Sequence, residues 1–257
     1  MAFSHRGALH KSTGYTSLSM SVPESAIHPG AYRSGDMLLA VVRSNTGFTG
    51  SGFSIPQGWW DLTGTHPKSA AGPVAGIFVK RLTTAADFTA THTFSGWKSG
   101  TNLQVLGFMT VVRGLSNLQS DWYNKNYSNG AIPERIDTYR GAVDFALYSY
   151  ELYAGDTGSA VLATDGWKLI TSARTDGGTN SLRSAISLHY RELTVDDPAY
   201  VRKGEVVRVG TTRRQDLAMV TVADMFSPKG KPVTQPFSKV YVGDNEARLH
   251  LGERQIW

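Results

Sequence analysis

The chain has 257 residues, of which 40% are hydrophobic and 18% are charged, so it can bury a core and is not expected to be disordered. Its 26 Lys and Arg residues exceed its 21 Asp and Glu residues by five, but they are dispersed along the chain, which argues against a nucleic-acid partner. The absence of cysteine excludes disulfides, cysteine–zinc sites and thiol nucleophiles.

Short segments in which apolar and polar residues alternate run through the whole chain. Residues 17–22, 143–148 and 186–191 have this period of two, which is typical of strands with one face on a core. Residues 37–42 are apolar throughout, which indicates a central strand covered on both faces. No long window combines helical spacing with helix caps. The sequence therefore predicts an all-β fold, most simply a β-sandwich.

The chain also contains a long-range internal repeat. The first match has a spacing of 106 positions (141 − 35), and the spacing grows along the chain, as loop insertions would cause. The matching segments are 35–41 with 141–147, 58–59 with 166–167, and 75–83 with 184–194. We interpret the repeat as two tandem β-sandwich domains of similar topology.

The repeat and the composition divide the chain into five segments. Two connecting segments are polar or rich in turn-forming residues, and the second contains three prolines that stiffen it into an extended spacer. The expected segments are a first sandwich at 1–117, a connector at 118–136, a second sandwich at 137–226, a Pro-rich spacer at 227–238 and a short C-terminal β-hairpin tail at 239–257.

The tail repeats a nine-residue phrase, since residues 240–244 match residues 249–253 (249 − 240 = 9). Each copy predicts a strand, a turn and a second strand. Two such hairpins bury too little apolar surface to be stable alone, so we expect a neighbouring chain or another copy to cover them. The alternative is that the tail packs on the second sandwich of its own chain. The expected interface residues are Tyr241, Leu249, Leu251, Ile256 and Trp257.

The chain lacks the sequence motifs of catalysis. It has no G-x-S-x-G nucleophile motif, no H-E-x-x-H or paired-histidine metal motif and no phosphate-binding loop. We therefore expect no enzyme activity, no metal and no cofactor. The first twenty residues have no apolar signal region and no run of eighteen apolar residues occurs, so we expect neither a secretory signal nor membrane insertion.

The tryptophans allow two interpretations. Trp59 and Trp167 occupy matching places in the repeat, which favours a role as core anchors. Trp60 and Trp97 have no counterpart in the second copy, so they are candidates either for the core or for stacking on the flat face of a glycan ring. Lys80 and Arg81 are interpreted as exposed strand residues.

A set of short motifs carries a resemblance to a known family. They are Gly35 to Val42, Pro56 to Trp59, Ile77 to Arg81, Asp87 to Phe94 and Val105 to Gly114. This pattern resembles a β-sandwich module of tail and surface proteins of tailed bacteriophages. The doubled phrase that ends on Trp257 resembles the C-terminus of minor tail proteins of siphophages that infect actinobacteria. The second copy departs from the pattern, because Ala142 replaces Asp36.

The resemblance implies a structural protein of a bacteriophage virion, most simply a minor tail protein at or near the tail tip. Such a protein would be assembled in the host cytoplasm and act through contacts with other tail proteins and with copies of itself in a symmetric homo-oligomer. Three alternatives remain at this point. They are a receptor-binding or glycan-binding module for the host cell envelope, a capsid decoration protein and a glycan-cleaving enzyme.

Overall fold

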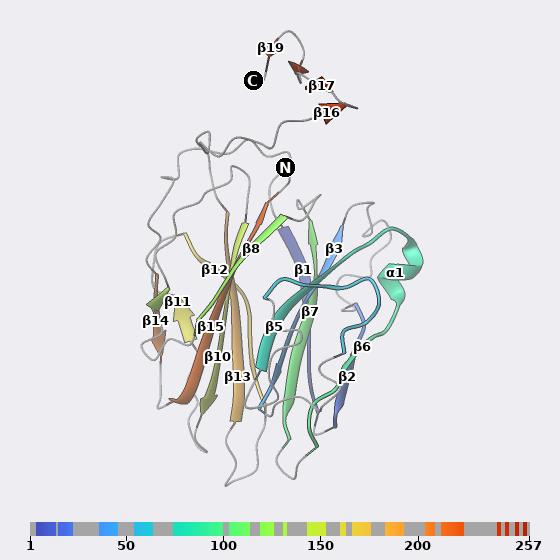
Figure 1. Ribbon diagram of the computed structural model, residues 1–257. Helices are drawn as coiled ribbons and strands as arrows, with labels where there is room; N and C mark the ends of the chain where they lie inside the picture. Colours follow the sequence, from blue (N-terminus) through green and yellow to red (C-terminus); the bar gives the residue numbers. More distant parts are fainter. Residues whose placement is uncertain are drawn as a thin grey trace.

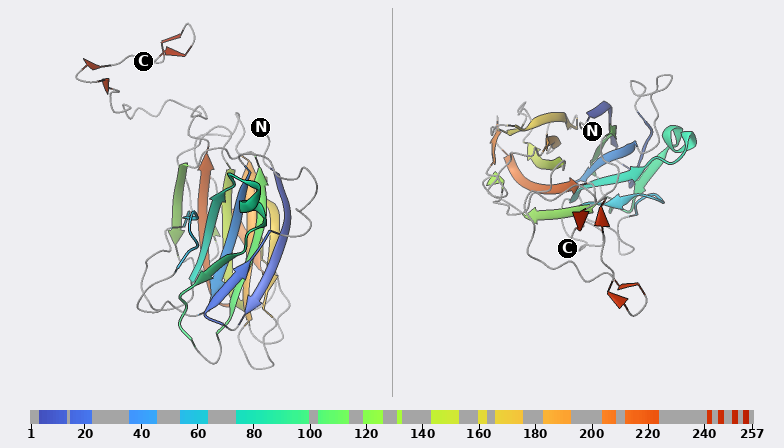
Figure 2. Two further views of the ribbon diagram at one scale, coloured as in Figure 1. Left: turned by 90° about the vertical axis from the view of Figure 1, so that its right-hand side faces the viewer. Right: turned by 90° about the horizontal axis from the view of Figure 1, so that it is seen from above.

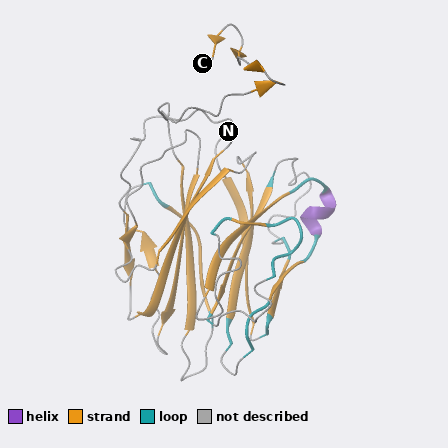
Figure 3. Cartoon of the chain, in the orientation of Figure 1, coloured by secondary structure: helices purple, strands orange, loops and turns teal. Residues whose placement is uncertain are grey.

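The computed structural model consists of antiparallel β-sheets with one five-residue helix, α1 (Ala85–Thr89), in the described part of the chain (Figures 1 and 3). The prediction of an all-β fold is confirmed. The structure describes residues 4–13, 15–22, 36–45, 54–63, 74–99, 103–113, 119–125, 131–132, 143–152, 160–162, 166–175, 183–192, 204–208, 212–223, 241–242, 245–246, 250–251 and 254–255.

The first large sheet has five strands, in the order β1-β7-β3-β5-β4, and each strand is antiparallel to its neighbours. Its central strand β3 is buried along its whole length, as its continuous apolar sequence predicts. The strands are β1 (Ser4–Thr13), β3 (Met37–Ser44), β4 (Trp60–Asp61), β5 (Val74–Arg81) and β7 (Val105–Arg113).

The second large sheet has the order β8-β15-β10-β13-β12. Strand β1 lies beside β7 in the first sheet, and β8 lies beside β15 in the second. The order then continues as β3-β5-β4 in the first sheet and as β10-β13-β12 in the second, so the two sheets have the same succession of strands. The strands are β8 (Gln119–Lys125), β10 (Val143–Leu152), β12 (Lys168–Arg174), β13 (Arg183–Glu192) and β15 (Thr212–Ala223).

The two large sheets pack face to face (Figures 1 and 2). Strand β1 lies beside β12, and β7 lies beside β13. The residues that alternate toward the partner sheet interdigitate into one buried cluster, as in other β-sandwiches. This inter-sheet cluster contains Met37, Leu39, Val41, Leu62, Ile77, Val79, Leu106, Phe108 and Val112 from the first half of the chain, and Val143, Phe145, Leu147, Ile186, Leu188 and Tyr190 from the second. One core therefore joins residues that the sequence assigns to separate domains.

Three polar contacts also join the two large sheets. Arg43 on β3 forms a buried ion pair with Glu151 on β10 at 3.8 Å. The side-chain oxygen of Gln104 accepts hydrogen bonds from the Thr175 hydroxyl at 2.7 Å and from the Ser184 amide at 3.2 Å. These contacts join the two halves of the chain beside the shared apolar cluster.

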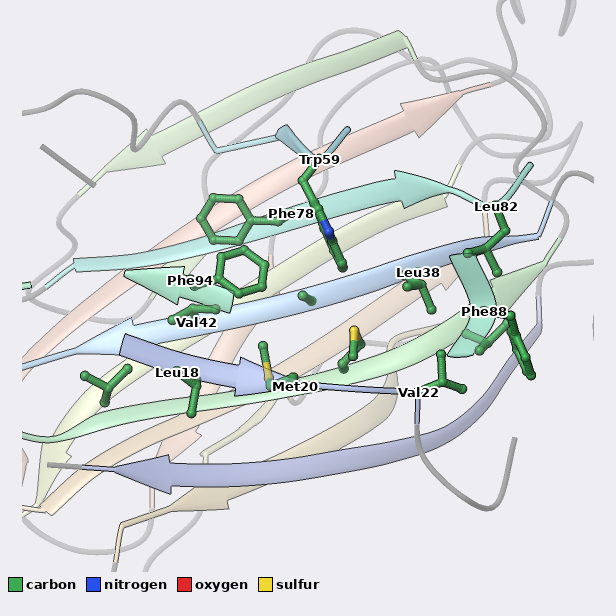
Figure 4. Packing of buried hydrophobic residues seen from close by; sticks show 14 of the residues in the cluster. Leu18, Met20, Val22, Leu38, Val42, Trp59, Phe78, Leu82, Phe88 and Phe94 are labelled. Carbon is green, nitrogen blue, oxygen red and sulfur yellow. The ribbon is translucent and has the colours of Figure 1, made fainter. Parts of the chain in front are cut away.

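A second buried cluster covers the outer face of the first large sheet (Figure 4). Here a small sheet of β2 (Ser17–Met20) and β6 (His92–Ser95) packs over β3, β5 and β7. Gly107 on β7 allows this close approach, because a Cβ at that position would lie 2.6 Å from the Leu18 side chain and 3.1 Å from the Met20 sulfur. Figure 4 shows Trp59, Phe78 and Phe94 close together, and the ring of Phe94 contacts both of the others.

The second half has its own small sheet and part of the expected connector within it. This sheet has the order β11-β14-β9, formed by β11 (Ala160–Leu162), β14 (Gly204–Arg208) and β9 (Ala131–Ile132). Segment 118–136 was expected only to link the domains, but it supplies both β8 and β9. The aromatic pair Trp122-Tyr123 in this segment has high strand propensity, which outweighs its polar neighbours.

The C-terminal tail forms two short hairpins in the described residues. Strand β16 (Tyr241–Val242) pairs with β17 (Asn245–Glu246), and β18 (His250–Leu251) pairs with β19 (Arg254–Gln255). Every strand of the second hairpin begins nine positions after its equivalent in the first (250 − 241 and 254 − 245). Each copy of the doubled phrase therefore contains two paired strands, as expected, although Asn245 and Arg254, which were expected in the turns, begin the second strand of each pair.

Candidate functional site

The two tail hairpins carry part of the expected assembly interface. Tyr241 lies on β16 and Leu251 lies on β18. In Figures 1 and 2 these short strands stand apart from the two large sheets. Three further residues of the expected interface lie outside the described part of the chain: Leu249, Ile256 and Trp257.

The two tryptophans that were candidates for glycan stacking have different environments. Trp60 on β4 is 52% exposed, whereas Trp97, which follows β6, is 1% exposed and belongs to the outer cluster of the first half. The structure therefore does not bring them together on one surface. The ring of Trp97 is covered by the core and is closed to a ligand, while a face of Trp60 is open to solvent.

Trp59 is a core residue, as its place in the repeat predicts. It is 4% exposed, and its indole N–H donates a hydrogen bond to Nδ1 of His92 at 3.2 Å. Its ring contacts His92 and Phe94 edge to face, at centroid distances of 5.1 and 5.3 Å. Trp167, at the matching place in the second half, was also expected in the core, but it is half-buried and belongs to neither buried cluster.

A tight turn and a pair of side-chain hydrogen bonds fix β4, the two-residue strand that contains Trp60. The Trp59 amide donates to the Pro56 carbonyl at 3.2 Å, and Gly58 between them has a φ of 78°, as the third residue of a type II turn requires. On the other side, the Asp61 carboxylate accepts hydrogen bonds at 2.9 Å from both the amide and the hydroxyl of Thr63. Trp60 therefore lies on a constrained strand although its side chain is exposed.

Arg81 is a second exposed side chain near Trp60, at the corner of the first large sheet where β4 pairs with β5. The sequence alone did not connect the two residues. Trp60 pairs with Val79 on β5, so Arg81, two residues farther along β5, lies on the same face of the sheet as Trp60. Only the strand register reveals this neighbourhood, because the two residues are 21 positions apart in the sequence (81 − 60).

The Asp87 carboxylate caps the N-terminus of α1. It accepts hydrogen bonds from the amides and hydroxyls of Thr83 and Thr84 and lies 3.1 Å from the Lys80 ammonium. The hydrogen bonds from Thr83 and Lys80 hold the pKa of Asp87 well below its usual range. A carboxylate that stays ionised in this way fits a capping box and not a proton-transfer group.

Three histidines have lowered pKa values because they are withdrawn from water. Burial lowers the pKa of His5 on β1 and of His92 on β6, and it lowers the pKa of His189 on β13 to about 4. They lie on three different sheets, and burial favours the neutral form of each. In the described part of the chain, no group of three or more His, Asp or Glu side chains is arranged to hold a metal ion.

Comparisons with known proteins add no assignment to this geometry. No protein-family model matches the chain, and neither a curated protein nor a solved structure matches it. Within the described residues, no helix has the length and hydrophobicity needed to cross a membrane.

Proposed function

We propose that this protein is a non-enzymatic structural component of a bacteriophage virion, a minor tail protein at or near the tail tip. The observation that carries the proposal is the pair of C-terminal hairpins, spaced by nine residues, that follows a spacer with three prolines. This arrangement supports a rigid body with a tethered assembly element. The resemblance of the doubled phrase to the C-termini of minor tail proteins points to the same role.

Strand pairing is the mode of contact that suits these hairpins. Each hairpin has two residues per strand, so it leaves backbone edges available to a partner and has little apolar surface of its own. An added strand from a neighbour supplies main-chain hydrogen bonds and covers the apolar side chains in one step. We therefore assign the tail to contacts with another tail protein or with a second copy in a symmetric oligomer.

We also propose that the rigid body is a duplicated β-sandwich unit. The matching succession of strands in the two large sheets supports the duplication. Met37 pairs with Val112, and its repeat counterpart Val143 pairs with Val222, which defines the counterpart position for every residue of the two sheets. Counterpart residues such as Leu39 and Phe145 fill the same inter-sheet cluster. The two copies therefore face each other as the subunits of a two-fold dimer would.

Removal of Lys239–Trp257 tests the proposed role of the tail. The truncated protein is supplied in place of the full chain during particle assembly, and its incorporation is measured by immunoblot of purified particles. We expect the sandwich body to keep its melting curve while incorporation is lost, because the hairpins stand apart from the two large sheets. Immunogold labelling of intact particles then distinguishes the tail tip from the capsid surface.

Two outcomes would reject the proposal. If the truncated protein loses thermal stability but still enters particles, the tail is a cap on its own chain. If label against the full chain is absent from intact particles, the protein is not a virion component. A variant that reverses one hairpin sequence, residues 241–246, keeps length and composition and serves as the matched control for the deletion.

A further inference from the structure

Trp60 and Arg81 form an exposed pair at one corner of the first large sheet. They are diagonal neighbours on the same face of β4 and β5, a relation that places Cβ atoms about 7 Å apart. Trp60 is 52% exposed and Arg81 is also exposed. Neither side chain has a hydrogen bond, ion pair or ring contact with another described residue. The corner therefore presents an indole face beside a free guanidinium.

The counterpart corner of the second half has a different, self-contained chemistry. Lys168 replaces Trp60, Tyr190 replaces Val79 and Glu192 replaces Arg81 at the same register positions. Lys168 lies 3.5 Å from the Glu192 carboxylate and 5.6 Å from the centre of the Tyr190 ring. At this corner the Lys168 ammonium therefore interacts with both the acid and the aromatic ring. The first corner has the ring of Trp60 and the cation of Arg81. Its third residue is Val79, so these three positions contain no acid.

The first corner is also more rigid than an exposed edge needs to be. Trp59 anchors one end of β4 in the core, and the hydrogen bonds between Asp61 and Thr63 hold the other end. The Thr63 hydroxyl in turn accepts a hydrogen bond from the Ile77 amide at 3.2 Å. A platform that is fixed before binding reduces the entropy lost when a ligand binds.

We propose that the Trp60–Arg81 corner is a binding site for an anionic saccharide. The flat indole suits the C–H face of a pyranose ring, and the guanidinium suits a carboxylate, sulfate or phosphate on the same sugar. The net charge of +5 favours the approach of such a ligand. This site is separate from the tail hairpins and does not depend on the proposed virion role.

A saccharide fits this corner better than a protein surface does. A stable protein interface needs about 800 Å² from each partner, with an apolar centre. The other exposed large apolar side chains in the described residues are Tyr15 and Leu169. Leu169 lies on β12, an edge strand of the other large sheet, and Tyr15 precedes β2. Among the described residues, Trp60 is therefore an isolated aromatic face and not the centre of an apolar patch.

Titrations of the full chain with defined saccharides test the site. The probes are an oligogalacturonate, the same oligomer with its carboxylates methyl-esterified, a heparin-derived tetrasaccharide and a polyglutamate peptide. We expect an acidic saccharide to shift the indole N–H signal of Trp60 in nitrogen–proton spectra. Trp60→Ala and Arg81→Gln should each raise the Kd of the acidic saccharide by about tenfold. The Kd of the esterified oligomer should be unchanged by Arg81→Gln.

The counterpart corner supplies the matched control, Lys168→Gln, which should leave the Kd unchanged. Both test residues are exposed, so unchanged melting curves will show that the variants are folded. The proposal is overturned if neither acidic saccharide shifts the Trp60 signal at millimolar concentration. It is also overturned if Lys168→Gln weakens binding as much as Arg81→Gln, or if polyglutamate binds as well as the saccharides, which would indicate an acidic peptide as the ligand.

Discussion

Asp36 and Arg113 form a two-point ion pair that ties the start of β3 to the end of β7. Arg113 donates from Nε to one carboxylate oxygen of Asp36 at 2.6 Å and from Nη2 to the other at 2.5 Å. These hydrogen bonds raise the pKa of Arg113, and the Asp36 side chain is 2% exposed. At the counterpart positions of the second half the sequence has Ala142 and Ala223, so both partners are replaced together.

The first prediction is that the two members of this pair depend on each other. Asp36→Ala leaves the Arg113 guanidinium without its main anion in a largely buried place, and we expect it to lower the free energy of unfolding by about 3 kcal/mol. Adding Arg113→Ala, which reproduces the alanines of the second half, should recover part of that loss. Urea unfolding of the two single variants and the double variant measures the coupling. Strictly additive losses would contradict the prediction.

The sequence predicted the strands that alternate cleanly and the presence of paired strands in each copy of the tail phrase. Strand β1 was not predicted, because its residues Ser4–Thr13 are mostly polar or small and lack a strong period of two. As an edge strand of the sheet, β1 needs less apolar surface than the central strand β3. Segment polarity therefore identifies central strands better than edge strands.

The packing partner of each sheet face was beyond the reach of the sequence. A period of two shows that one face of a strand such as β10 is buried, but not what covers it. The residues Phe145 and Leu147 proved to pack against the other half of the chain. The same limit applies to the candidate site, because the exposure of Trp60 and the burial of Trp97 follow from tertiary packing and not from local pattern.

The second prediction concerns the close approach of β2 to the first large sheet. Gly107→Ala places a methyl group 2.6 Å from Leu18 Cδ2 and 3.1 Å from both the Met20 sulfur and the Val41 carbonyl oxygen. We expect a loss of about 1–3 kcal/mol in the free energy of unfolding, measured in urea, because the surrounding core is tightly packed. Leu18→Ala removes the nearest atoms, so the double variant should lose less than the sum of the two single variants. If Gly107→Ala leaves the free energy of unfolding unchanged, β2 can move away from the sheet without cost.

The third prediction is an acid-dependent loss of stability that arises from His189. Its pKa is lowered to about 4 in the folded chain from 6.5, and burial is the cause. As the pH falls below 6.5 the unfolded chain takes up a proton that the folded chain rejects, so stability decreases until about pH 4, below which both states are protonated. The expected total loss is about 3.5 kcal/mol, because the pKa falls from 6.5 to about 4 and each pKa unit corresponds to about 1.4 kcal/mol.

His189→Phe isolates this contribution, because the counterpart of His189 in the first half is Phe78 on β5. The variant should have a shallower dependence of unfolding free energy on pH between 6.5 and 4. His5 and His92 have lowered pKa values of the same sign and remain in both proteins, so the difference between the two pH profiles reports His189 alone. Parallel profiles would show that His189 does not titrate differently in the two states.

The fourth prediction is that the two halves unfold together. Their large sheets share one apolar cluster, and the buried ion pair between Arg43 and Glu151 crosses from β3 to β10. Independent domains would give two transitions, whereas a shared core should give one, with equal calorimetric and van't Hoff enthalpies. Glu151→Ala should lower the free energy of unfolding by about 3 kcal/mol, because it leaves the fully buried Arg43 without this carboxylate.

An exposed ion pair provides the control for that substitution. Lys168 and Glu192 lie 3.5 Å apart with side chains that are 62% and 34% exposed, within one sheet and not between the two. Glu192→Ala should therefore change the unfolding free energy by less than about 1 kcal/mol. If Glu151→Ala instead splits the unfolding curve into two transitions, the ion pair is what couples the halves. If the unmodified chain already unfolds in two steps, the shared cluster does not unite them.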